Sequence, residues 1–271
     1  MNPVVRLALE EDIGSGDVTS AACVPESRMA NGRFLAREPL ALAGMDVLSE
    51  IYGLRGGVEE LRILKRDGDL CAEGEVIATV RGRARVLLEC ERVALNFLQR
   101  LSGVATAARR YADAVAGTRC RVLDTRKTTP GLRILEKRAA AAGGVTNHRM
   151  GLWDAVLIKN NHIAAAGGVR LAIAAARASS SLPLEIEVRT REELRDALDC
   201  GAQHLLLDNL TPAEAREWIA EIAGRAKVEL SGGITLENVR AYAEAGADFV
   251  SSGAITHSAR AMDISFRLEL T

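Results

Sequence analysis

Charged or glycine-rich residues follow six short apolar segments in the second half of the chain. The segments are RVLD (121–124), DAVLIK (154–159), LEIEV (184–188), HLLLD (204–208), KVELSGG (227–233) and DFVSSGA (248–254). Arginine, lysine and glycine loops bind carboxylates and phosphates, whereas aspartate and glutamate stabilise positive charge or hold a cation. Polar residues scattered at random would not fall so regularly after such segments. Together they indicate one active site.

The stretches between these segments are alanine-rich and charged, with the apolar spacing of helices. Strands that alternate with helices predict a parallel sheet, and in a β/α barrel the carboxyl ends of the strands meet on one face. The residues at these ends are Asp124, Thr125, Arg126, Lys127, Lys159, Glu187, Asp208, Ser231, Gly232, Gly233, Ser251, Ser252 and Gly253. The pattern occupies only residues 121–257, whereas eight β/α units usually take about 250 residues. We therefore expect six units in a smaller or incompletely closed barrel.

Composition narrows the class of protein. The chain has 271 residues, 48% of them apolar and 26% charged, which is ordinary for a globular protein of one or two domains. A net charge of −1 gives no support for nucleic-acid or membrane partners, and no apolar run is long enough to span a bilayer. The five cysteines form no C-x-x-C pair, and the N-terminus is not signal-like. We expect a cytoplasmic protein whose thiols are small buried hydrophobes.

The first hundred residues have a different pattern. Helices are expected at 2–12 and 45–53, and strands at 32–38, 61–65 and 75–82. Residues 84–103 carry apolar side chains at spacings of three and four, which predicts an amphipathic helix that stops at Gly103 and leaves Arg92 and Arg100 on other faces. The C-terminal segment is expected to form a helix, residues 259–271, that packs back on the N-terminal part. The predicted domains are thus residues 1–104 with that helix, and residues 105–258.

Longer motifs connect the chain with a known family. They are GDVTS (16–20), AGMDV (43–47), ERVALNFLQRLSG (91–103), DTRKTTPGLR (124–133), GGVTNHRMGL (143–152), IKNNHI (158–163), LLLDN (205–209), SGGI (231–234) and GAITHSARAMDIS (253–265). Nearly the whole chain, in order, resembles the quinolinate phosphoribosyltransferases. The resemblance implies an N-terminal α/β sandwich domain followed by a six-stranded, incomplete, TIM-like α/β barrel. It also implies a homodimer with shared active sites, or a higher oligomer built from such dimers.

The resemblance also implies a reaction. Members of this family transfer the 5-phosphoribosyl group from phosphoribosyl pyrophosphate to quinolinate, and they release pyrophosphate and carbon dioxide as nicotinate mononucleotide forms. This is a step of de novo NAD biosynthesis, and it requires Mg²⁺. Quinolinate has two adjacent carboxylates, which guanidinium forks match in geometry. By resemblance Arg126, Lys127, His148 and Arg149 line the pocket for it, and Arg92 reaches in from the other subunit.

The remaining candidates fit the second substrate. Ser231, Gly232, Gly233, Gly253 and Ala254 follow the last two strands, where barrel enzymes commonly hold a phosphate, and His257 is either a further donor or a packing residue. We expect Glu187 and Asp208 to stabilise an oxocarbenium-like centre and to hold Mg²⁺ indirectly, through waters or substrate. Lys159 would neutralise phosphate charge. The predicted catalytic set is Lys127, Lys159, Glu187 and Asp208, while His204 is interpreted as structural.

Three other functions are compatible with parts of this pattern. A phosphoribosyltransferase-like protein associated with molybdenum transport shares DTRK and the glycine loops, but the NHR-x-GL and IK-x-NHI motifs disfavour it. A Schiff-base aldolase would use Lys159 as its nucleophile. A non-catalytic phosphate-binding protein would show a broken set of charged residues, and here the set is complete. Asn160 stands where many relatives carry an acidic residue, which removes a charge beside Lys159.

Overall fold

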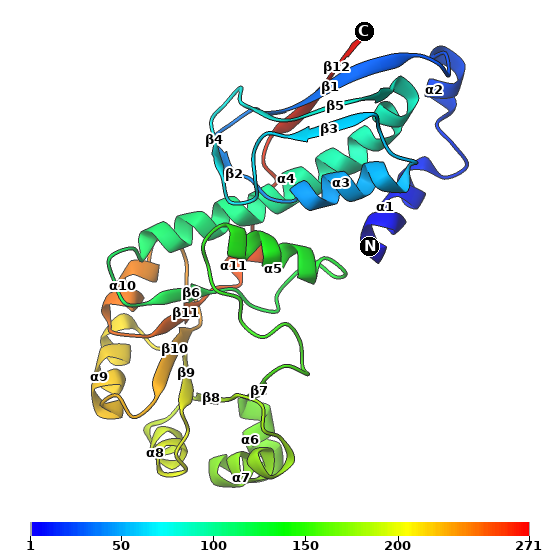
Figure 1. Ribbon diagram of the computed structural model, residues 1–271. Coiled ribbons are helices and arrows are strands. Elements are labelled where there is room, and N and C mark those ends of the chain that lie inside the picture. The colour runs from blue at the N-terminus through cyan, green and yellow to red at the C-terminus, as the bar shows by residue number, and fades with distance from the viewer. Residues whose placement is uncertain (1, 271) are drawn as a thin grey trace. The chain divides into compact units, whose positions relative to one another are not determined.

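The computed structural model describes residues 2–270, which fold into two compact units (Figure 1). Unit 1 comprises residues 1–109, 129–144 and 259–271, and unit 2 comprises residues 110–128 and 145–258. The segment 129–144, which the sequence assigned to the barrel, clusters with unit 1 instead. Its helix α5 (Arg133–Ala142) carries the fully buried Glu136, whose carboxylate pairs with Arg100 at 2.7 Å. This ion pair, buried on the glutamate side, connects α5 with α4 (Ala84–Ala114) in unit 1.

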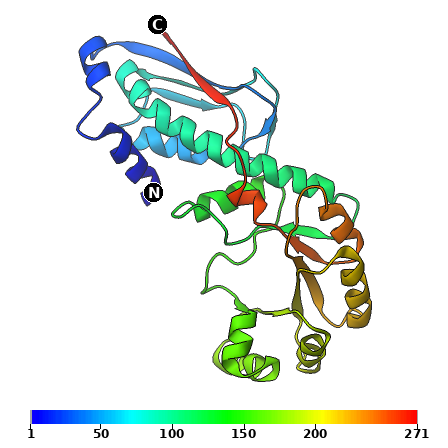
Figure 2. The same ribbon diagram turned by 180° about the vertical axis from the view of Figure 1, so that it is seen from behind.

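Unit 1 is built on an antiparallel sheet. Its strand order is β12-β1-β5-β3, with β1 (Met29–Ala36), β3 (Glu60–Ile63), β5 (Val76–Arg83) and β12 (Ile264–Leu270). A separate pair is formed by β2 (Leu40–Ala41) and β4 (Leu70–Cys71). The helices are α1 (Pro3–Ile13), α2 (Val18–Cys23), α3 (Met45–Leu54), α4 (Ala84–Ala114) and α5. Figures 1 and 2 show α3 and the first part of α4 along one face of the sheet. The helices expected at 2–12 and 45–53 and the three early strands are confirmed.

Helix α4 does not stop at Gly103, so that prediction was wrong. The helix continues to Ala114, and Ala105 and Ala108 are fully buried along it. A glycine inside a helix costs about 1 kcal/mol relative to alanine, which the buried face offsets. Here glycine is required for space, because a Cβ at position 103 would lie 1.9 Å from the carbonyl oxygen of Arg260. Gly103 marks a close approach between backbones rather than a helix end.

The predicted C-terminal helix was also wrong, because residues 264–270 form strand β12. This strand pairs antiparallel with β1, and the rings of Phe34 and Phe266 contact each other in a tilted arrangement with centroids 4.8 Å apart. Apolar residues alternate with Ser265, Arg267 and Glu269 in this stretch. A period of two is typical of a strand with one buried face. The segment does return to the N-terminal part of the chain, but through a ladder of backbone hydrogen bonds.

Unit 2 contains a six-stranded parallel sheet. The order is β6-β11-β10-β9-β8-β7, with β6 (Arg121–Leu123), β7 (Val156–Ile158), β8 (Leu184–Val188), β9 (His204–Asp208), β10 (Lys227–Ser231) and β11 (Phe249–Ser251). Its helices are α6 (Asn160–Ala166), α7 (Val169–Ser179), α8 (Arg191–Asp199), α9 (Pro212–Ile222), α10 (Val239–Glu244) and α11 (Ala254–His257). Within the described residues β6 and β7 do not pair, so the barrel is incomplete. The predicted fold class and all six predicted strands are confirmed.

Alternation along the strands of unit 2 separates packing from chemistry. In β8 the fully buried Ile186 and Val188 alternate with Glu185 and Glu187, and in β9 the fully buried Leu205 and Leu207 alternate with Leu206 and Asp208. Successive strand residues point to opposite faces, so one face packs apolar side chains and the other presents carboxylates. Glu187 and Asp208 reach the same cavity from that second face.

No helix within residues 2–270 is both long enough and apolar enough to cross a bilayer.

Candidate active site

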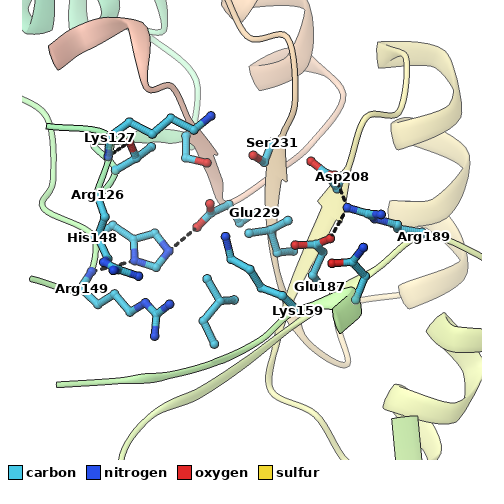
Figure 3. A pocket seen from close by; sticks show the side chains of 15 residues that line it. Arg126, Lys127, His148, Arg149, Lys159, Glu187, Arg189, Asp208, Glu229 and Ser231 are labelled. Carbon is cyan, nitrogen blue, oxygen red and sulfur yellow. Dashed lines mark hydrogen bonds and ion pairs between the residues drawn. The ribbon is translucent and has the colours of Figure 1, made fainter. Parts of the chain in front are cut away.

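A cavity of about 310 Å³ opens at the carboxyl ends of the unit 2 strands (Figure 3). We call it the basic lobe. Its lining brings together eight of the predicted residues: Arg126, Lys127, His148, Arg149, Lys159, Glu187, Asp208 and Ser231. An adjoining cavity of about 500 Å³, the glycine lobe, shares Lys127, Asp208 and Ser231 with it. The glycine lobe is also lined by Gly232, Gly233, Gly253, Ala254 and His257.

One wall of the basic lobe carries positive charge. Arg126 and Arg149 both line it, and Figure 3 shows Lys159 extending its amine into the same space. Burial, followed by the nearby charge of Arg126, lowers the pKa of Arg149. Arg149 Nη1 also donates a hydrogen bond of 3.0 Å to the carbonyl of Ala155, which fixes the direction of its fork. Two neighbouring guanidinium groups on one wall form a site suited to an anion with more than one oxygen pair.

Asp124 fixes the segment that carries Arg149 on this wall. It directly follows β6 and is fully buried. Its Oδ2 accepts a hydrogen bond of 2.6 Å from Asn147 Nδ2, and its Oδ1 accepts one of 2.8 Å from the backbone nitrogen of His148. The residue therefore fixes the NHR segment, and with it the position of Arg149.

His148 is held at both ring nitrogens. Nε2 lies 3.2 Å from Glu185 Oε2 and 3.4 Å from Glu229 Oε2, and the backbone N–H of Arg149 donates to Nδ1 at 2.7 Å. Burial opposes a charged ring, but hydrogen bonds to Glu185 and then to Glu229 outweigh it and raise the pKa of His148 to about 10. Because Nδ1 accepts from a backbone N–H, it carries no proton in this arrangement, and the ring proton is on Nε2, facing the carboxylates. A second proton, on Nδ1, would displace the hydrogen bond from Arg149.

These three side chains also offer ligand atoms within 4.8 Å of one another, a spacing that a metal ion could use. Both carboxylates already accept from the ring, however. Burial and the neighbouring Glu229 raise the pKa of Glu185, which favours a shared proton over two free carboxylates. We therefore interpret the cluster as a hydrogen-bonded triad that holds His148 in place at the floor of the basic lobe.

The opposite wall is acidic and contains one arginine that the sequence did not single out. Glu187 is only 6% exposed, and Arg189 Nη2 lies 2.7 Å from its Oε1. The same Nη2 donates to Asp208 Oδ2 at 3.3 Å, as Figure 3 shows. Asn209 Nδ2 donates to that oxygen as well, at 2.7 Å. Arg189 thus lies between the two carboxylates that the sequence predicted to act on the reaction centre.

The glycine lobe is shaped by residues without side chains. Gly232 has φ of 96°, and a Cβ there would lie 2.2 Å from Asn209 Oδ1. At Gly253 a Cβ would lie 2.6 Å from Cδ of Lys127, so the lysine stem crosses directly over this loop. Ser252 Oγ donates to the carbonyl of Ile234 at 2.8 Å and joins the two loops. Backbone is therefore exposed to the cavity, as phosphate-binding loops require.

Comparison with known proteins identifies the family. The model of the quinolinate phosphoribosyl transferase N-terminal domain matches residues 17–102, and that of the C-terminal domain matches residues 104–267. The chain belongs to the quinolinate phosphoribosyl transferase family. The family that the sequence motifs indicated is confirmed.

Relatives in this family are similar along nearly their whole length. The chain is 41% identical to the probable nicotinate-nucleotide pyrophosphorylase (carboxylating) of Bacillus subtilis, covering 96% of this chain and 91% of that protein. It is 42% identical to the nicotinate-nucleotide pyrophosphorylase (carboxylating) of Mycobacterium leprae, covering 97% and 95%. The crystal structure of NadC from Streptococcus pyogenes superposes with a TM-score of 0.94 at 38% identity, covering 99% of this chain and 96% of that one.

Most of the predicted site residues line the two lobes, and three further residues of this region were not predicted. Arg92 is exposed on α4 in unit 1 and lines neither lobe of this chain. Arg189, Glu185 and Glu229 were not predicted. Arg189 directly follows a strand, so the rule that located Glu187 would have located it too. Glu185 and Glu229 lie inside strands, on the face that also carries Glu187 and Ser231, and only the alternation of those strands points to them.

Proposed function

We propose that the protein transfers the 5-phosphoribosyl group from phosphoribosyl pyrophosphate to quinolinate, with loss of one carboxylate as carbon dioxide, to give nicotinate mononucleotide and pyrophosphate in de novo NAD biosynthesis. The observation that carries this proposal is the separation of charge across one cavity. Arg126 and Arg149 line one side and match a dicarboxylate, Glu187 and Asp208 line the other, and Lys159 extends between them. The glycine lobe adjoins both and suits a phosphate group.

The chemistry follows from this placement. Quinolinate is oriented by Arg126 and Arg149, so that its ring nitrogen attacks the anomeric carbon of the ribose as the bond to pyrophosphate breaks. Positive charge develops on the ribose, and Glu187 and Asp208 stabilise it. The ring nitrogen is then quaternary, and the ring accepts the electron pair that the adjacent carboxylate leaves behind as carbon dioxide. The carbon then takes up a proton. No strong base is needed, since positioning and charge account for catalysis.

Mg²⁺ belongs to this proposal, and the acidic wall suits it. Mg²⁺ prefers carboxylate and phosphate oxygens and usually keeps several waters. The buried Oε1 of Glu187 has no hydrogen bond of normal direction, although Arg189 Nη2 is 2.7 Å away. Glu187 and Asp208 would hold the ion through waters or substrate. When bound, it would neutralise the departing pyrophosphate.

Lys127 and Lys159 complete the proposed catalytic set. Lys127 lines both lobes and packs over Gly253, where its amine can meet phosphate oxygens. Lys159 lies between the basic and acidic walls, where it can neutralise substrate charge (Figure 3). Ser231, Gly232, Gly233, Gly253 and Ala254 provide the phosphate loops. His257 accepts or donates at Nδ1 with Ser258 Oγ, 2.7 Å away, and its ring edge lies against Gly253.

The first test is incubation of purified protein with quinolinate, phosphoribosyl pyrophosphate and Mg²⁺, following nicotinate mononucleotide and carbon dioxide. Nicotinate in place of quinolinate is the control. We expect product from quinolinate alone. No product, or product from nicotinate only, would contradict the proposal.

A homodimer with shared sites is the second part of the proposal, in which Arg92 acts on the partner's basic lobe. Its support is that Arg92 is exposed and that Leu152 and Trp153, which follow Arg149, are each 71% exposed, as apolar surface awaiting a partner would be. Mixing Arg92→Ala subunits with Lys159→Ala subunits tests it. Random reassortment gives half mixed dimers with one intact site each, so about a quarter of wild-type activity should return. No recovery would contradict sharing.

A cytoplasmic location completes the proposal. All five cysteines are free, and Cys71, Cys90 and Cys120 are buried. Free thiols persist in a reducing compartment.

A further inference from the structure

Arg189 contacts the two carboxylates that the proposed reaction would use to hold Mg²⁺. Its Nη2 lies 2.7 Å from Glu187 Oε1 and 3.3 Å from Asp208 Oδ2, so one nitrogen contacts both carboxylates. These are the two residues that would face the ribose and Mg²⁺. The guanidinium itself lines the basic lobe and is 45% exposed at its side chain. It is therefore able to move away from the carboxylates without disturbing packed structure.

Arg189 and Glu187 form an ion pair without a well-directed hydrogen bond. Glu187 is buried, yet its Oε1 receives no hydrogen bond of normal geometry. A buried carboxylate oxygen without a directed donor retains much of its affinity for a cation. Asp208 differs, because its Oδ2 also accepts from Asn209 Nδ2 at 2.7 Å and is held in place by it. The pair therefore forms a fixed acidic site that one monovalent group only partly neutralises.

Two lysines line the same cavity as the carboxylates of Glu187 and Asp208. Lys159 lines the same cavity, and Lys127 lines it on the side of Arg126 (Figure 3). Neither forms a described ion pair with Glu187 or Asp208, whereas Arg189 pairs with both. Arg189 is thus the group whose displacement exposes the acidic site.

We propose that Arg189 is the resident counter-cation of the Glu187–Asp208 pair and that a divalent cation displaces it. This inference rests on the proposed function for the identity of the cation. In the free protein the guanidinium holds two like charges together. When the metal–substrate complex arrives, the metal and its waters take that position and the guanidinium turns into the open cavity. Arg189 therefore weakens the affinity of the protein for a divalent cation by itself and makes the acidic wall selective for a cation delivered with phosphate.

Binding of Mn²⁺ tests this without any turnover. Mn²⁺ accepts the same oxygen ligands as Mg²⁺ and is visible by electron paramagnetic resonance. The affinity is measured for the full-length protein with Mn²⁺ alone, and again with phosphoribosyl pyrophosphate present and quinolinate absent. For a unit charge about 5 Å from a divalent ion in a water-like medium, Arg189→Gln should bind Mn²⁺ about tenfold more tightly than the wild type. Arg189→Lys, which keeps the charge, should stay near the wild type.

Arg191→Gln is the matched control. Arg191 lies two residues further along and pairs with Glu217 at 3.1 Å and with Glu221, away from both lobes. Its loss should leave Mn²⁺ binding unchanged. Equal or weaker binding by Arg189→Gln, or no Mn²⁺ binding by any protein with or without phosphoribosyl pyrophosphate, would overturn the inference. Failure of the proposed function would be visible separately, as absence of nicotinate mononucleotide from the wild type.

Discussion

Replacing Asp124 should loosen the basic lobe even though this side chain does not line it. Asp124 is fully buried and accepts hydrogen bonds from Asn147 Nδ2 at 2.6 Å and from the backbone nitrogen of His148 at 2.8 Å. In Asp124→Ala both donors lose their acceptor. In Asp124→Asn the remaining oxygen can stay with the backbone N–H, which can only donate, and Asn147 can rotate its amide to accept from the new NH₂.

Asp124→Ala should therefore destabilise the protein more than Asp124→Asn. A hydrogen bond to a charged group contributes about 1.5–3 kcal/mol, and a buried donor without an acceptor costs about 1–3 kcal/mol. We expect unit 2 to lose about 4 kcal/mol of unfolding free energy in Asp124→Ala and about 2 kcal/mol in Asp124→Asn. Because the same bonds position Arg149, KM for quinolinate should rise about tenfold in Asp124→Asn, with a smaller change in kcat.

Tryptophan fluorescence during urea unfolding measures the first effect. Both tryptophans of the chain, Trp153 and Trp218, belong to unit 2, so the signal reports on that unit. Asp199→Asn is the control, since Asp199 pairs with Arg170 at the surface and its loss should cost less than about 1 kcal/mol. An unchanged midpoint and KM in Asp124→Ala would refute the anchoring role. Equal destabilisation by Ala and Asn would refute the rotation of Asn147.

Three further results are expected. Glu187→Ala and Asp208→Ala should each lower kcat about 100-fold or more, because the proposal assigns these residues to the ribose. The dissociation constant of quinolinate, measured by calorimetry, should stay within about threefold. Unchanged turnover would remove them from the proposed catalytic set. Gly232→Ala should raise KM for phosphoribosyl pyrophosphate and cost about 2 kcal/mol of unit 2 stability, since its Cβ would lie 2.2 Å from Asn209 Oδ1. Gly224→Ala, at φ of 75° with no atom within 4 Å, is the control that measures backbone strain alone, and equal costs for the two would exclude the steric cause. Finally, the carboxylates of the triad raise the pKa of His148 from 6.5 to about 10, so its contribution to stability is complete below pH 6.5 and is lost as the pH rises toward 10. Glu229→Gln should flatten that decline in urea titrations at several pH values, and an unchanged slope would mean that the triad does not hold the proton.

The strands and the face that carries the site were predictable because the signal is local. Polar residues stand at or just after the carboxyl ends of several strands here, and RVLD, HLLLD and KVELSGG show this directly in the sequence. Glu187 and Asp208 were found in this way, and they line one cavity. Family motifs added His148 and Arg149, whose segment has no regular structure of its own to predict.

What escaped prediction depends on partners distant in the sequence. Gly103 has the appearance of a helix stop until the carbonyl of Arg260 is placed against it. The role of Glu229 follows from strand order, because β10 and β8 flank β9 and bring their glutamates to one histidine. Strand β12 is a different case. Apolar and polar residues alternate through 264–270, and this period of two already indicated a strand in the sequence.

The pairing of β12 with β1 has a consequence for synthesis of the protein. Strand β1 pairs with β5 on one side and with β12 on the other, and β12 is the last strand of the chain. While the ribosome is still translating the barrel, β1 therefore remains an exposed edge with unpaired N–H and C=O groups. Such edges recruit other strands and promote aggregation. Unit 1 lacks the second partner of β1 until residues 264–270 emerge, so the nascent chain should depend most on chaperones just before that point.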